Sequence, residues 1–239
     1  MMEIIKDLYV KHAGTLGYRI IAGTMRLQGI NISDNTVYSY MKQLGLQAII
    51  MRKKPDYVYG KKHYLYDNLI NRDFTASAPN EKWCTDFTYL QLSDGSKRYN
   101  CSIIDLYDRS IVATLNGKSI TSKLAIDTLK LAFKRTVKTS NLILHSDQGS
   151  QFASYEFADY CESNNITQSM SKAGCPYDNA PIERFYNTYK NELINQYHFK
   201  DDETLNQATY EFVYAWYNQC RPHTYNKGLT PNMIRQSNY

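Results

Sequence analysis

The chain has 239 residues, 43% of them hydrophobic and 13% aromatic, which is enough for one large or two smaller globular domains with a real core. Its mean hydropathy is negative and it has no long apolar run, which excludes a membrane-spanning segment. The net charge of +5 permits a nucleic-acid partner without requiring one.

The cysteines and the start of the chain indicate the compartment. The five cysteines are odd in number and contain no CxxC pair, which argues against a disulfide framework and against a zinc knuckle. The opening "MMEIIKDLYVKH" carries acids and no apolar segment typical of a signal peptide. We therefore expect a cytoplasmic protein.

Residues 1–47 are predicted to form three short helices. The third, "NISDNTVYSYMKQLG", has Ser33 and Asp34 as possible N-caps and ends at Gly45. A helix, a tight turn and a second helix with a polar outer face are typical of a helix-turn-helix domain that reads the DNA major groove. The residues expected to contact DNA are Asn35, Thr36, Ser39, Tyr40 and Lys42. A generic three-helix bundle is the alternative.

Residues 48–77 are predicted to be a basic, tyrosine-rich linker. Basic and aromatic residues alternate here with little periodicity, which favours a segment lying along a phosphate backbone. Arg52, Lys53 and Lys54 are its expected DNA contacts. A solvated connector without a ligand is the alternative.

Residues 78–239 are predicted to form an α/β domain. Three strand-like segments come first, and Asp94-Gly95 suggests a hairpin between the first two. An amphipathic helix, the strand "LILHS", a helix, the strand "ITQSM" and two long helical stretches follow. This order predicts a mixed sheet flanked by helices.

Three acids of this domain occupy positions that composition does not require. Asp86 lies within the first strand, Asp147 at the end of "LILHS", and Glu183 in the first turns of a long helix. If these strands are neighbours, the carboxylates converge, and a divalent cation such as Mg²⁺ or Mn²⁺ relieves their repulsion. Each acid also has a simpler explanation: a buried hydrogen-bonded residue, a turn residue, or an acid stabilising a helix N-terminus.

Three segments that carry these acids together resemble the catalytic blocks of DDE transposases and retroviral-type integrases. They are "WCTDFTYL", "LHSDQGSQF" and "SMSKAGCPYDNAPIERFYNTYKNEL", with 35 residues between Asp147 and Glu183. The resemblance is strongest to the second-frame (OrfB) product of the third insertion-sequence family. It extends to the helix-turn-helix segment and to the tail "YNQCRPHTYNKGLTPNMI". The zinc module of retroviral integrases is missing.

The resemblance implies a ribonuclease-H-like core with two divalent metal ions held by Asp86, Asp147 and Glu183. It also implies double-stranded DNA as a partner, assembly of several copies on that DNA, and cooperation or fusion with the first-frame (OrfA) product. A basic residue at Lys190 would contact the transposon end, and Asn187 lies on the same helix face. An ordinary exposed lysine is the alternative for Lys190.

Other residues of these motifs have predicted structural roles or two alternative roles. Asp178 and Asn179 are expected to cap the helix of Glu183, and Gly149 to permit the turn after Asp147. His145, Arg221 and His223 could serve either the structure or DNA binding. The sequence thus predicts a metal-dependent transposase subunit. Its rivals are a ribonuclease-H-type nuclease and a catalytically silent DNA-binding regulator.

Overall fold

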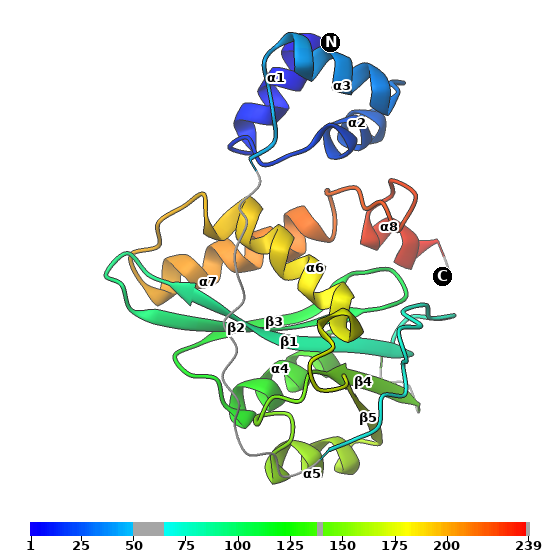
Figure 1. Ribbon diagram of the computed structural model, residues 1–239, viewed down its shortest axis with the longest axis vertical. Helices are drawn as coiled ribbons and strands as arrows, with labels where there is room; N and C mark the ends of the chain where they lie inside the picture. The colour runs from blue at the N-terminus through cyan, green and yellow to red at the C-terminus, as the bar shows by residue number, and fades with distance from the viewer. Residues whose placement is uncertain (50–64, 138–140, 238–239) are drawn as a thin grey trace.

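The computed structural model describes residues 1–49, 65–137 and 141–237. Its first three helices, α1 (Met2–Lys11), α2 (Tyr18–Leu27) and α3 (Asp34–Gln43), form a separate small unit (Figure 1). They enclose a hydrophobic cluster of their own, which contains Ile5, Leu16, Ile21, Met25 and Val37. The predicted helix-turn-helix architecture is confirmed. Ser33 caps α3 by accepting a hydrogen bond from the Thr36 backbone.

A five-stranded sheet forms the centre of the larger unit, in the order β3-β2-β1-β4-β5. The strands are β1 (Lys82–Gln91), β2 (Lys97–Asp105), β3 (Ile111–Gly117), β4 (Leu142–Ser146) and β5 (Ile166–Met170). The first three are antiparallel, and β4 and β5 run parallel to β1. The predicted hairpin joins β1 to β2, where Gly95 adopts a left-handed φ of 83°.

Helices cover both faces of this sheet, because residues of β1 alternate between two hydrophobic clusters (Figure 1). Trp83 and Phe87 face the cluster of α4 (Ser122–Arg135) and α5 (Tyr155–Ser163). Cys84 and Leu90 face the cluster of α6 (Ala180–Tyr189) and α7 (Asp202–Tyr210). The predicted mixed α/β sheet flanked by helices is confirmed.

The two long helical stretches contain π-helical turns that the sequence did not predict. After α6 the chain continues as η2 (Lys190–Ile194), and after α7 as η3 (Glu211–Tyr217). The backbone N–H of Asn195 accordingly bonds the Lys190 carbonyl at 2.8 Å, five residues back. Two short helices were also unexpected: η1 (Pro176–Asn179) and α8 (Pro231–Gln236). No helix in the described ranges is long and apolar enough to cross a membrane.

The last part of the predicted linker packs against the larger unit. Ile70 is buried in the cluster beneath α6, and the Leu69 backbone N–H donates to the Ser169 hydroxyl on β5. We therefore propose that the linker ends before residue 67, upstream of the expected boundary at 77.

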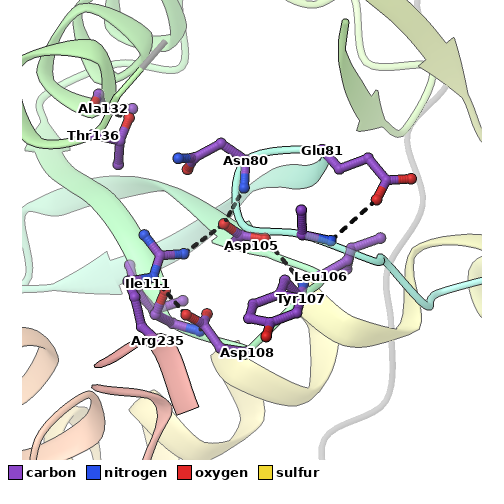
Figure 2. Close-up of polar contacts among 12 residues, drawn as sticks. Asn80, Glu81, Asp105, Leu106, Tyr107, Asp108, Ile111, Ala132, Thr136 and Arg235 are labelled. Carbon is purple, nitrogen blue, oxygen red and sulfur yellow. Dashed lines mark hydrogen bonds and ion pairs between the residues drawn. The ribbon is translucent and has the colours of Figure 1, made fainter. Parts of the chain in front are cut away.

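The C-terminal helix α8 is fastened to the turn between β2 and β3 by a buried charge cluster (Figure 2). Arg235 pairs with Asp105 through Nη2 and with Asp108 through Nε, each at 2.5 Å. Both acids are fully buried, and backbone N–H groups of Asn80 and Tyr107 also donate to Asp105. The tail that follows η3 is thus tied to the sheet at its far end.

Candidate active site

Strand register brings Asp86 and Asp147 together. Cys84 of β1 lies opposite His145 of β4 in the parallel pair. Continuing that register by two residues puts Asp86 opposite Asp147. Asp86 also has the same parity as Cys84, so its side chain lies on the face of the sheet covered by α6.

The Asp147 carboxylate is held by the turn that follows β4. Oδ1 accepts a hydrogen bond from the Gly149 backbone N–H at 2.8 Å. A Cβ at position 149 would lie 2.9 Å from the same oxygen and 2.2 Å from the Gln151 amide nitrogen. The backbone of Gly149 is not left-handed, so the turn itself does not require glycine. A side chain here would instead collide with the Gln151 and Asp147 side chains unless they moved.

Helix α6 carries Glu183 across the sheet and is anchored beside Asp86. Ile182 and Phe185 are fully buried, whereas Glu183 is exposed. The Tyr186 hydroxyl donates to the Asp86 carbonyl at 2.6 Å and accepts from the Ser102 backbone N–H at 2.9 Å. Sequence reasoning missed Tyr186, although its spacing of four from the apolar Ile182 predicts that it turns toward the sheet.

The predicted capping roles of Asp178 and Asn179 are wrong. Asn179 occupies the N-cap position of α6, but its side chain makes no capping bond and instead donates to the Thr85 carbonyl at 3.2 Å. The buried Asp178 carboxylate accepts from Arg72 at 2.6 Å and from Asn68 at 3.0 Å. Both residues therefore tie the loop before α6 to other parts of the chain, since long-range partners compete with the local cap.

Burial and the neighbouring negative charges both raise the pKa values of Asp86 and Glu183. Burial raises the pKa of Asp86 well above its usual range, and the charges of Asp147 and Glu183 raise it further. Burial and the charge of Asp147 likewise raise the pKa of Glu183. The Lys190 ammonium acts on Asp86 in the opposite direction. Asp86, Asp147, Glu183 and Lys190 thus share one electrostatic environment.

The donor chemistry of this cluster fits a hard divalent cation. It offers carboxylate oxygens, which repel one another, and the buried Asn179 Oδ1 has no hydrogen-bond partner among the described residues. Within the described ranges, however, no three His, Cys, Asp or Glu side chains already stand in ligating positions. Glu183 is exposed, so its side chain has more than one rotamer open to it.

The residues predicted to contact DNA are distributed over three regions. On α6 and η2, Asn187 is exposed and Lys190 is half-buried. On α3, Asn35, Ser39 and Lys42 are exposed. Arg52, Lys53 and Lys54 lie outside the described residues.

Two of the predicted contacts on α3 have structural roles. The Thr36 hydroxyl lies 2.7 Å from the capping Ser33 hydroxyl, and half-buried Tyr40 packs against the three-helix cluster. Exposed Tyr38 completes the outer face instead. Its spacing of three from Asn35 could have identified it.

His145, Arg221 and His223 have structural roles. His145 is buried between the hydroxyls of Ser169 and Ser171, at 2.8 and 3.1 Å. Arg221 forms a buried two-point ion pair with Glu192. His223 is buried with its Nε2 3.1 Å from the Tyr217 carbonyl. The printed polar contacts of all three side chains are made within the protein.

Known families match almost the whole chain. Two family models described as integrase core domain match residues 76–176 and 164–231, and one described as HTH-like domain matches residues 1–54. Transposase InsF for insertion sequence IS3A of Escherichia coli (strain K12) is 34% identical over 99% of this chain and 82% of its own length. The chain belongs to the IS3-type DDE transposases.

A second relative and two solved structures agree. The putative transposase InsK for IS150 of Escherichia coli (strain K12) is 32% identical over 98% of this chain and 82% of its own. The HTLV-2 integrase catalytic core in complex with magnesium aligns with a TM-score of 0.53 at 23% identity, over 66% of this chain and 98% of that one. A chain of a simian T-cell lymphotropic virus intasome aligns with a TM-score of 0.53 at 17% identity, over 97% of this chain and 74% of that one. The transposase therefore has the predicted ribonuclease-H-like integrase fold.

Proposed function

We propose that this transposase cleaves and joins DNA strands at the ends of an insertion sequence, with divalent cations held by Asp86, Asp147 and Glu183. The observation that carries the proposal is the pairing of Cys84 with His145 between β1 and β4, which Asp86 and Asp147 each follow by two residues. The charge of Asp147 acts on the buried Asp86, which supports their proximity. The raised pKa values of Asp86 and Glu183 support it, because a bound cation would offset the burial and the neighbouring negative charges that raise them.

Two ions, Mg²⁺ or Mn²⁺, suit an all-oxygen site with open positions. When bound, such ions supply charge stabilisation at the attacking and leaving oxygens of a phosphoryl transfer. The residues of the chain have a positioning task. Gly149 orients the Asp147 carboxylate, Tyr186 fixes α6 beside Asp86, and the Asn179 amide ties the start of α6 to β1.

Water and a DNA hydroxyl are the two nucleophiles in this proposal. Water attacks the phosphodiester at the insertion-sequence end, and the released 3′-hydroxyl then attacks a second strand. No side chain forms a covalent intermediate. Lys190 and Asn187 on the α6 side hold the phosphates near the acids, and the exposed face of α3 reads the end sequence. Magnesium in one structural neighbour and the intasome assembly of another support a cation-dependent enzyme that works as an oligomer on double-stranded DNA.

Cooperation with a first-frame (OrfA) product belongs to the same proposal. The resemblance to the third insertion-sequence family, which implies cooperation or fusion with that product, supports this partner. Adding the first-frame product to the reaction should then raise the rate or precision of end cleavage. An unchanged rate and cleavage pattern would contradict this partner.

A strand-transfer assay on labelled end DNA tests the proposed activity. Cleavage at the end followed by joining to target DNA is expected with Mg²⁺ or Mn²⁺ and should stop when EDTA is added. Activity on RNA–DNA hybrid without end cleavage would support the nuclease alternative. End binding without cleavage under any cation would support the silent regulator.

A further inference from the structure

One tryptophan connects the two units of the chain. Trp216 of η3 packs against the hydrophobic cluster beneath α6 and also against the cluster of the helix-turn-helix unit. Its indole ring stacks on His12 at the end of α1, with ring centroids 4.2 Å apart and planes at 28°. Trp216 is half-buried, so its environment depends on this contact.

The orientation of Trp216 is fixed by the Arg221–Glu192 ion pair. The indole Nε1 donates to Glu192 Oε2 at 3.0 Å, and Arg221 holds both oxygens of the same carboxylate. The side chains of Arg221 and Glu192 are only 13% and 7% exposed. A buried pair of this kind is costly unless its hydrogen bonds are satisfied, and here the indole satisfies one of them. The ion pair therefore presents the ring to α1.

A second contact lies next to Arg221 in sequence. A Cβ built on Gly23 of α2 would lie 2.8 Å from Pro222 Cγ and 2.9 Å from its Cβ. Glycine inside a helix is unfavourable by itself, so its presence here is explained by the approach of the proline ring. The backbone of Gly23 has an ordinary helical conformation, which leaves this contact as its structural reason.

The tail that carries these residues is rigid with respect to the sheet. The side-chain amide of Asn218 accepts from the Ile111 backbone N–H and donates to the Ile111 carbonyl. Arg235 is held by Asp105 and Asp108 (Figure 2). A cavity of about 440 Å³ between the two units is lined by residues including His12, Trp216, Cys220 and Met233. Interfaces between domains of one chain resemble transient protein–protein interfaces, so motion of the two units relative to each other is expected.

We propose that the surface formed by Trp216 and Pro222 is the docking site of the helix-turn-helix domain and fixes α3 relative to the acidic cluster. The tail motif "RPH" then acts in domain docking: Arg221 orients Trp216, Pro222 receives Gly23, and His223 supports η3. The consequence for cleavage rests on the proposed function. The docking itself does not.

Tryptophan fluorescence quenching of the full chain tests the docking, with side-chain size changed at positions 23 and 222. Gly23→Ala should push the domains apart, although alanine favours the helix itself. The acrylamide quenching constant of the tryptophan emission should rise and the emission should shift to the red, because Trp216 becomes exposed while Trp83 is fully buried. Pro222→Gly removes the atoms that collide, so the double variant Gly23→Ala/Pro222→Gly should return toward wild-type quenching. Gly17→Ala is the matched control, since nothing lies within 4 Å of that position.

Wild-type quenching in Gly23→Ala, or a rise that Pro222→Gly does not reverse, would overturn the docking site. The quenching measurement needs neither DNA nor catalysis, so its failure is independent of the proposed function. With active wild-type protein, Gly23→Ala should keep end binding and lose the accurate position of cleavage. Wild-type cleavage in a variant that is demonstrably undocked would overturn the positioning role alone.

Discussion

Asp147 and Gly149 are coupled through a single oxygen atom. The Gly149 backbone N–H donates to Asp147 Oδ1 at 2.8 Å, and any Cβ at position 149 would lie within 2.9 Å of that oxygen. Side-chain size at position 149 thus controls where the carboxylate points.

Gly149→Ala should therefore lower the cleavage rate by about 10²-fold without unfolding the protein, since small displacements of a catalytic group have effects of that size. The single-turnover rate and the melting temperature provide the measurement. Gln151→Ala is the control, because a Cβ at position 149 would also collide with the Gln151 side-chain amide. If the double variant Gly149→Ala/Gln151→Ala regained full activity, the clash with Asp147 would be refuted.

Arg235 is predicted to be essential for stability. Its removal leaves Asp105 and Asp108 buried without their cation, so Arg235→Gln should lower the free energy of unfolding by about 3 kcal/mol. The matched control is Arg26→Gln, whose ion pair with Asp34 is about 41% exposed on each side and should matter by less than about 1 kcal/mol. Urea unfolding measures both. Equal effects of the two substitutions would contradict a stabilising role for the buried ion pairs of Arg235.

His223 should make the protein sensitive to acid. Burial, and next the Arg221 charge, lower its pKa from 6.5 to about 3. Below pH 6.5 the unfolded chain binds a proton that the folded chain does not, so stability falls as the pH falls toward 3. Lowering the pH from 7 to 5 should remove about 2 kcal/mol through this residue.

The comparison variant is His223→Gln, which keeps a side-chain donor near the Tyr217 carbonyl and does not titrate. Urea unfolding at pH 7 and pH 5 should show a smaller loss in this variant by that amount. The same loss in both proteins would mean that His223 is protonated in the folded state as well.

Lys190 is predicted to hold a DNA phosphate beside the acids. It begins the π-helical turn η2 and lies near enough to Asp86 to act on its pKa. Lys190→Ala should weaken end binding and reduce the slope of log affinity against log salt by about one. Lys190→Arg should keep most of the binding because it keeps the charge. A slope that is unchanged in Lys190→Ala would identify an ordinary solvated lysine.

The sequence predicted the sheet because its strands carry local signals. The hairpin at Asp94-Gly95, the apolar run "LILHS" and the helical periodicity of 122–135 each correspond to an observed element. The convergence of Asp86 and Asp147 follows from the adjacency of β1 and β4 together with their register. Recognition of the family depended on the spacing of the three acids, which the chain itself displays.

Contacts between residues far apart in sequence could not be predicted in this way. Arg72 and Asp178 are 106 residues apart, and Tyr186 and Ser102 are 84 apart. Local propensity favoured Asp178 and Asn179 as caps, but both side chains form hydrogen bonds with residues far away in the sequence. The role of Arg221 likewise depends on Glu192 and on a tryptophan that contacts the other domain.

The central claim is that Asp86, Asp147 and Glu183 form the cation site of the transposase. Its most direct test measures end binding and end cleavage on the same preparations of Asp86→Asn, Asp147→Asn and Glu183→Gln, with Asp159→Asn on α5 as an exposed-acid control. Each of the three variants should bind end DNA nearly as the wild type does, because affinity comes mainly from phosphate contacts elsewhere. Cleavage should fall to the level of a reaction without protein in all three and remain normal in the control. Cleavage near the wild-type level in any one of the three would remove that residue from the site and contradict the account.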